Sequence, residues 1–129
     1  VQDVPREQTN RYGIVSAAHT AGDLTDISGI VEKPAPADAP GTLAVAGRYI
    51  LKPGIFQELK NTPKGAGGEI QLTDAIAQLL KKEKVFAYRY QGIRYDCGSK
   101  LGFLQATVDL GEHHPQVGAE FTAWLATRS

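Results

Sequence analysis

The sequence predicts a protein of the α/β or α+β class, with a sheet and flanking helices. Three strand-like runs come first, followed by two helix-like segments, one more strand-like run and two further helices. The resulting order, β-β-β-α-α-β-α-α, shows no internal repeat. With 129 residues the chain is long enough for one domain that buries a core without a disulfide or a metal ion.

The first half begins with a predicted hairpin. Residues 1–10 are polar and lack an apolar rhythm, so we expect a linker or an arm there. The runs 11–17 and 24–32 carry the β-branched and apolar residues typical of strands. Because Gly22 and Asp23 are turn residues between these runs, the two strands are expected to be antiparallel neighbours.

A proline-rich loop over 34–40 precedes a third predicted strand over 42–51, in which apolar residues alternate. A short helix is expected over 54–59, and the glycines of 61–68 predict a loop. Residues 72–80 give the clearest helical signal, because their apolar positions recur at i, i+3, i+4, i+7 and i+8.

The last third continues the alternation of strand and helix. A strand is expected over 85–90, and a very short one over 94–96. Ser99 is placed to cap a helix that ends near Glu112, and a last helix is predicted over 116–126.

Composition narrows the function classes. Fourteen basic and fourteen acidic residues give a net charge of zero, which argues against a nucleic-acid partner. No apolar stretch approaches the roughly 18 residues of a membrane span. Cys97 is the single cysteine, so the protein is expected in a reducing cytoplasm. The Cys97 thiol is expected to be buried. Methionine is absent, even at position 1, which suggests a fragment of a longer protein.

Several motifs are weak on inspection. Gly65 and Gly67 invite a nucleotide-loop interpretation, but Ile70 stands where the third glycine is needed. His113 and His114 are neighbours and point to different faces of a helix, so helix-end capping is the better interpretation than metal binding.

Two charged residues precede Pro34 at the end of the second predicted strand. Pro34 favours extended backbone at Lys33, so Glu32 and Lys33 are expected to project to opposite sides. A carboxylate there can accept hydrogen bonds from two sugar hydroxyls, and an ammonium group can bind phosphate. The alternative is an ordinary solvated pair of charges.

Two further places combine polar groups with glycine. Asp96 precedes Gly98 and Ser99, where a carboxylate is placed either to bind a ligand and Mg²⁺ or to cap the following helix. Gly13 has no side chain, so a ligand can approach its backbone; a strand bulge is the alternative explanation.

Five strings occur in order along residues 11–125 and together suggest a family. The Gly-Gly-Glu-Ile-Gln-Leu-Thr-Asp and Tyr-Asp-Cys-Gly-Ser-Lys strings are the most specific, whereas Glu-Lys-Pro is shared more widely. The five are Tyr12-Gly13, Val31-Glu32-Lys33-Pro34, Gly47-Arg48-Tyr49, residues 65–75 and residues 94–102. In these strings the chain resembles the C-terminal half of bacterial UTP–glucose-1-phosphate uridylyltransferases, also called UDP-glucose pyrophosphorylases.

The resemblance implies the C-terminal part of a Rossmann-like sugar nucleotidyltransferase fold, with a mixed sheet. Residues 1–129 would be the sugar-phosphate-binding portion, and the nucleotide-binding N-terminal half would be absent. The implied roles are that Glu32 binds glucose hydroxyls, Lys33 binds phosphates and acts in catalysis, Gly13 offers its backbone to the sugar, Tyr49 reaches the sugar, and Asp96 helps to hold Mg²⁺.

The implied reaction converts UTP and glucose 1-phosphate to UDP-glucose and pyrophosphate without a protein nucleophile. The resemblance also implies a homo-oligomer. Because the family's glycine-rich loop and its uracil contacts are missing, we expect these 129 residues alone to be inactive. Two alternatives stay open: a non-catalytic sugar-phosphate-binding or oligomerisation module, and a thymidylyltransferase that uses glucose 1-phosphate.

Overall fold

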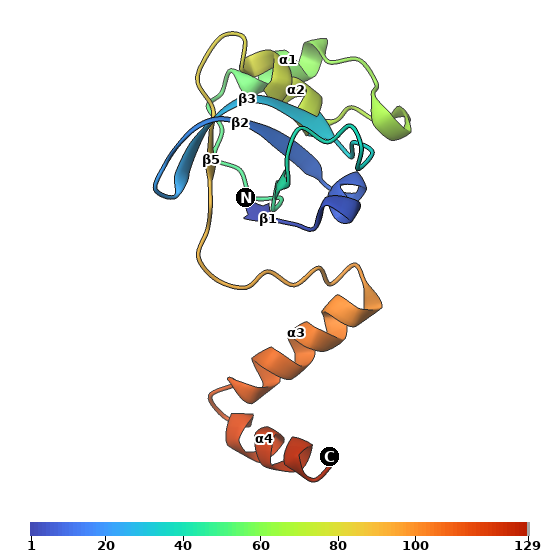
Figure 1. The fold of residues 1–129 in the computed structure, drawn as a ribbon, viewed down its shortest axis with the longest axis vertical. Helices are drawn as coiled ribbons and strands as arrows, with labels where there is room; N and C mark the ends of the chain where they lie inside the picture. Colours follow the sequence, from blue (N-terminus) through green and yellow to red (C-terminus); the bar gives the residue numbers. More distant parts are fainter. Residues whose placement is uncertain (129) are drawn as a thin grey trace. The chain divides into compact units, whose positions relative to one another are not determined.

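A computed structural model describes residues 1–128, apart from the side chain of Ala66. The chain divides after Gln91 into two compact units. The first contains a sheet with helices, and the second contains two helices (Figure 1). The α/β class predicted from the sequence is therefore confirmed.

The first unit is built on a five-stranded sheet with the order β1-β4-β2-β3-β5. Every pairing among these strands is antiparallel. The strands are β1 (Gln2–Asp3), β2 (Gly13–Ala21), β3 (Leu24–Glu32), β4 (Leu43–Ala44) and β5 (Phe86–Tyr88).

The central hairpin forms where the sequence predicts it. Ala21 pairs with Leu24 across a two-residue turn, in which Gly22 has a φ of +61°. Glycine adopts this left-handed conformation without a Cβ clash, so the turn is tight and the strands must run antiparallel. At the other end of the same ladder, Gly13 pairs with Glu32.

The sheet differs from the expected mixed arrangement, because all described pairings are antiparallel. Parallel neighbours need a long crossover between them. Here the helical crossover leads from β4 to β5, which are not neighbours, while β2 and β3 are joined by the tight turn.

The prediction of a linker or an arm over residues 1–10 is wrong. β1 pairs with β4, a 3-10 helix spans Arg6–Arg11, and Val4 and Thr9 are buried. Polar composition gave no sign of this packing, because the partner strand is about 40 residues away in sequence. The strand expected over 42–51 is also shorter, since only Leu43–Ala44 pairs.

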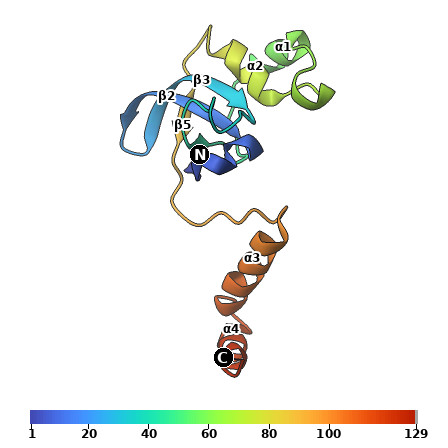
Figure 2. The same ribbon diagram turned by 45° about the vertical axis from the view of Figure 1, so that its right-hand side comes forward.

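Two helices cover the sheet of the first unit. Figures 1 and 2 show α1 (Ile55–Asn61) and α2 (Leu72–Leu79) together beside β3. A short 3-10 turn, η2 (Ala66–Gly68), lies between them. The apolar stripe of α2 packs into the hydrophobic core of this unit. The buried core residues include Val15, Ile27, Ile30, Ile55, Ala75, Ile76 and Leu79. Both predicted helices are confirmed.

The second unit contains α3 (Lys100–Glu112) and α4 (Gly118–Ala126). The predicted cap is present, because Ser99 Oγ accepts a hydrogen bond of 3.0 Å from the Gly102 N–H. Residues 94–96 do not form the short strand expected there. In residues 1–128, no helix combines the length and apolar character needed to cross a bilayer.

Candidate functional site

The Glu32 carboxylate lies where β3 ends beside the first turn of α2. Its side chain is only 15% exposed. The buried Thr73, on α2, donates a hydrogen bond of 3.0 Å from Oγ1 to Glu32 Oε2. A hydrogen bond to an ionised carboxylate is stronger than one between neutral groups. Glu32 is therefore held in place by a neighbouring element and is not a freely solvated strand end.

Gly13 faces this pair across the hairpin. A Cβ on Gly13 would lie 2.8 Å from Thr73 Cγ2 and 3.2 Å from Glu32 Oε2. The Gly13 carbonyl oxygen accepts a hydrogen bond of 2.9 Å from the Val45 N–H. Irregularities in the β2–β3 register lie at Ser16–Ala17 and Ala17–His19, so Gly13 is not a bulge. Close packing by Thr73 and Glu32 explains why a glycine stands here.

Lys33 does not have the extended backbone that Pro34 favours. Its φ is +45°, in the left-handed region, and its N–H donates a hydrogen bond of 3.0 Å to the Tyr12 carbonyl oxygen. Lys33 Nζ then lies 3.8 Å from Glu32 Oε1, and the lysine side chain is 56% exposed. The expectation that the two side chains point to opposite sides is therefore wrong, because the strand ends at Glu32 and the chain turns at Lys33.

Tyr49 lies on the loop after β4, outside the short strand. Partial burial, followed by the charge of Glu32, raises the pKa of the Tyr49 phenol above its usual value. The phenol is therefore within electrostatic reach of the carboxylate. The first unit thus brings Gly13, Glu32 and Lys33 together, with Tyr49 within electrostatic reach of Glu32; these are the four residues predicted to bind the sugar phosphate.

Asp96 belongs to the second unit, just before α3. Its Oδ1 accepts a hydrogen bond of 3.2 Å from the Gly98 N–H, and its carbonyl oxygen accepts bonds from the Ser99 N–H and Oγ, both 3.0 Å. These contacts support the capping turn. Cys97 is exposed, so the expectation of a buried thiol is wrong.

The described residues contain no group of three or more histidine, cysteine, aspartate or glutamate side chains able to hold a metal ion. Mg²⁺, however, is commonly bound by one or two carboxylates together with substrate phosphates. The half-buried Asp96 offers one such carboxylate. The oxygen chemistry of Asp96 therefore fits Mg²⁺, as one ligand of a site completed by other groups.

Sequence reasoning missed Thr73. The residue stands inside the Gln-Leu-Thr-Asp string, at the start of the helix predicted over 72–80. In the local sequence this threonine is one polar residue in the first turn of a predicted helix. The available signal was its place within a specific string, but only the fold brings it to Glu32.

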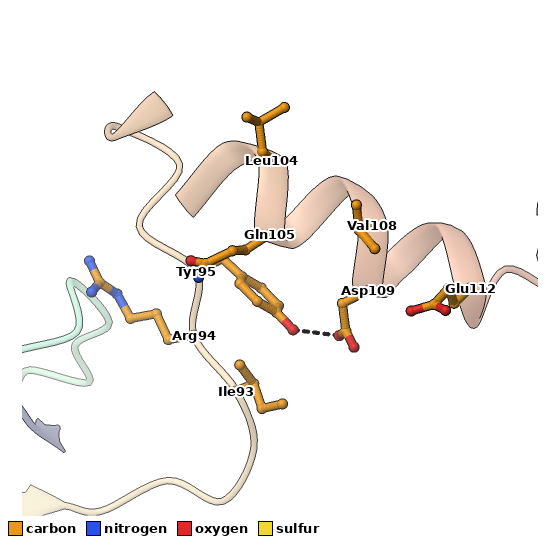
Figure 3. Close-up of a pocket in the computed structure, with 8 residues that line it drawn as sticks. All are labelled: Ile93, Arg94, Tyr95, Leu104, Gln105, Val108, Asp109 and Glu112. Carbon is orange, nitrogen blue, oxygen red and sulfur yellow. Dashed lines mark hydrogen bonds between the residues drawn. The ribbon is translucent and has the colours of Figure 1, made fainter. Parts of the chain in front are cut away.

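A groove in the second unit runs along α3 (Figure 3). Tyr95 points across it, and its hydroxyl donates a hydrogen bond to Asp109 Oδ2. This bond, followed by desolvation and then by the Asp109 charge, raises the pKa of Tyr95. The remaining lining residues are Ile93, Arg94, Leu104, Gln105, Val108 and Glu112. None of the predicted sugar-phosphate residues lines this groove.

The chain belongs to the nucleotidyl transferase family, whose model matches residues 1–113. It is similar to a UTP–glucose-1-phosphate uridylyltransferase of Staphylococcus epidermidis, with 42% identity over 97% of this chain. The corresponding protein of Streptococcus pneumoniae is 44% identical, again over 97% of this chain. The resemblance inferred from the sequence is confirmed.

Solved structures give the same result. A UDP-glucose pyrophosphorylase complexed with UDP-glucose matches 88% of this chain with a TM-score of 0.83 and 39% identity. A UDP-glucose pyrophosphorylase from Acinetobacter baumannii matches 100% of it with a TM-score of 0.86 and 45% identity. This chain spans 43% of the Staphylococcus protein and of the first structure, 42% of the Streptococcus protein and 44% of the Acinetobacter structure.

Proposed function

We propose that the protein from which this chain comes transfers a uridylyl group from UTP to glucose 1-phosphate, and that residues 1–129 supply its sugar-phosphate-binding portion. One observation carries the proposal: a fixed carboxylate and an exposed ammonium group lie side by side at the end of β3. Their chemistry matches the two ends of a sugar phosphate. Similarity to uridylyltransferases over 97% of the chain supports the same conclusion.

Each residue has a distinct role in this proposal. Glu32 accepts hydrogen bonds from sugar hydroxyls, and Thr73 occupies one lone pair of Oε2. Lys33, which is more than half exposed, places its charge on the phosphates. Tyr49, a phenol whose pKa is raised further above neutral pH, carries its proton, so its hydroxyl can donate to the sugar. Gly13 leaves room for the Glu32–Thr73 pair and brings the strand backbone next to the sugar.

The reaction is a direct displacement. A phosphate oxygen of glucose 1-phosphate forms a bond to the α-phosphorus of UTP, and the bond from that phosphorus to the β-phosphate oxygen breaks. Pyrophosphate leaves with the electron pair. Catalysis then consists of positioning and charge stabilisation, to which Lys33 contributes. Mg²⁺, with Asp96 as one ligand, would supply further neutralisation of phosphate charge when bound.

The nucleotide determines the test. The protein as encoded by its gene should release pyrophosphate from UTP and glucose 1-phosphate in the presence of Mg²⁺, and it should react much more slowly with dTTP. Faster turnover of dTTP would identify a thymidylyltransferase. Binding of glucose 1-phosphate without turnover of either nucleotide would identify a non-catalytic module. The 129 residues tested alone should show no turnover, because they lack a glycine-rich phosphate loop.

We further propose that the protein acts in the cytoplasm as a homo-oligomer. The second unit exposes large apolar side chains, among them Leu101 at 67%, Leu110 at 63% and Trp124 at 49%. Large apolar side chains gathered on one surface are typical of places where another part of the protein or another subunit packs. Native mass spectrometry of the encoded protein should give a multiple of the monomer mass, and a clean monomer at micromolar concentration would contradict this part of the proposal.

A further inference from the structure

We propose that Thr73 is a positioning residue for the sugar site, acting through both branches of its side chain. Its hydroxyl fixes Glu32, and its methyl group packs against Gly13. The inference rests on the proposed function, because the substrate that Glu32 binds is the glucose 1-phosphate named there.

The hydroxyl of Thr73 bonds to the sheet. Thr73 stands in the first turn of α2, two residues after the N-cap Gln71. The α2 N-cap, Gln71, makes no side-chain capping hydrogen bond, and Thr73 Oγ1 bonds to Glu32 Oε2 on the sheet. The first turn of α2 therefore contributes the Thr73 hydroxyl to the site around Glu32. A glutamate side chain has three rotatable bonds, and this contact holds its carboxylate in one arrangement.

The methyl group couples α2 to the hairpin. A Cβ on Gly13 would lie only 2.8 Å from Thr73 Cγ2, which is too close for two carbon atoms. Thr73 is 4% exposed and belongs to a helix packed into the core, so it has little freedom to move aside. Gly13, Glu32 and Thr73 thus form one packed group drawn from three elements. A change at Gly13 should displace the same carboxylate that Thr73 holds.

Kinetics on the encoded protein separate the two branches. Thr73→Val keeps the methyl volume and removes the hydroxyl, so the KM for glucose 1-phosphate should rise about tenfold. The KM for UTP should change by less than about twofold, because the lost contact orients only the sugar ligand. Thr73→Ser restores the hydroxyl and should recover most of the affinity for glucose 1-phosphate.

Thr62→Val is the matched control. Thr62 is also a buried threonine, and its Oγ1 donates a hydrogen bond of 2.8 Å to the Glu58 carbonyl oxygen at the end of α1. Loss of this hydrogen bond should lower the free energy of unfolding, as loss of the Thr73 hydrogen bond should. The KM for glucose 1-phosphate should not rise selectively in Thr62→Val. Equal KM values for wild type and Thr73→Val would overturn the role of the hydroxyl.

A double-mutant cycle tests the methyl group without any assay of activity. Gly13→Ala should destabilise the wild-type protein strongly in urea, and it should cost less in the Thr73→Ser background, where Cγ2 is absent. Additive effects of the two changes would overturn the packing role.

Calorimetry with glucose 1-phosphate keeps the inference separate from the proposed function. Binding by the wild-type protein that weakens about tenfold in Thr73→Val supports the inference even if no UDP-glucose forms. Failure of the wild-type protein to bind glucose 1-phosphate would overturn the inference, because Glu32 would then have no sugar ligand to be positioned for.

Discussion

Lys33 Nζ lies 3.8 Å from Glu32 Oε1, on the same side of the strand end. Two consecutive residues of an extended strand would point to opposite sides, and the left-handed φ of Lys33 changes that geometry. The carboxylate is mostly covered and the ammonium group mostly exposed. This arrangement can present hydrogen-bond acceptors and a positive charge to one ligand.

Lys33→Ala should lower the kcat/KM of the encoded protein by roughly 10- to 100-fold, because a hydrogen bond to a charged group contributes about 1.5–3 kcal/mol. The effect should be larger if the contact tightens in the transition state. Steady-state kinetics with both substrates varied measures it. Lys60→Ala, at an exposed lysine of α1, is the control. Wild-type rates for Lys33→Ala would remove the phosphate role.

Glu32→Ala should act mainly on the sugar substrate. The change removes acceptors for glucose hydroxyls, so the KM for glucose 1-phosphate should rise much more than the KM for UTP. Gly13 and Thr73 would also lose a packing partner, so a melting curve must accompany the kinetics. Equal effects on both substrates at unchanged stability would argue that Glu32 is an ordinary charged residue.

The backbone of Lys33 can be tested apart from its charge. A non-glycine residue in the left-handed region costs roughly 1–2 kcal/mol, and glycine avoids that cost at some loss of chain entropy. Lys33→Gly should therefore be more stable than Lys33→Ala by about 1 kcal/mol in urea unfolding. The two variants lose the same ammonium group, so their difference isolates the backbone. Equal stabilities would show that the φ of +45° carries no strain.

Asp96→Asn should weaken the dependence of activity on Mg²⁺. Asparagine keeps an oxygen that can accept the hydrogen bond from the Gly98 N–H, so the turn before α3 is preserved, but the negative charge is removed. The Mg²⁺ concentration needed for half-maximal rate should rise severalfold while stability stays near wild type. An unchanged Mg²⁺ dependence would restrict Asp96 to the turn.

His113 gives a pH test in the second unit. A hydrogen bond with the Asp109 carbonyl oxygen, and then the charge of the Asp109 carboxylate, raise the pKa of His113 above 6.5. Because the folded pKa is the higher one, this contribution to stability is complete below pH 6.5 and is lost as the pH rises through the folded pKa.

An NMR titration should place the pKa of His113 above 6.5, and Asp109→Asn should lower it without removing the backbone hydrogen bond. A pKa of 6.5 or less in the wild-type protein would contradict the arrangement at the end of α3.

The local sequence determined the elements whose signals are complete within a few residues. β3 matches its predicted bounds, because Gly22-Asp23 sets its start and Pro34 follows its end. The apolar period of α2 and the Ser99 cap of α3 are equally local, since each depends on neighbours within one or two helical turns. Four candidate residues of the sugar site could be named because they lie in short strings that occur in order and together resemble one family.

Tertiary structure decided what depends on partners far apart in the chain. The pairing of β1 with β4 turns a polar segment into the edge of a sheet, and no local pattern encodes that partner. The contact of Thr73 with Glu32 joins residues 41 positions apart, and the close approach to Gly13 adds a third element. A hydroxyl, a carboxylate and a missing Cβ become one site only when the packing of α2 on the hairpin fixes their separations.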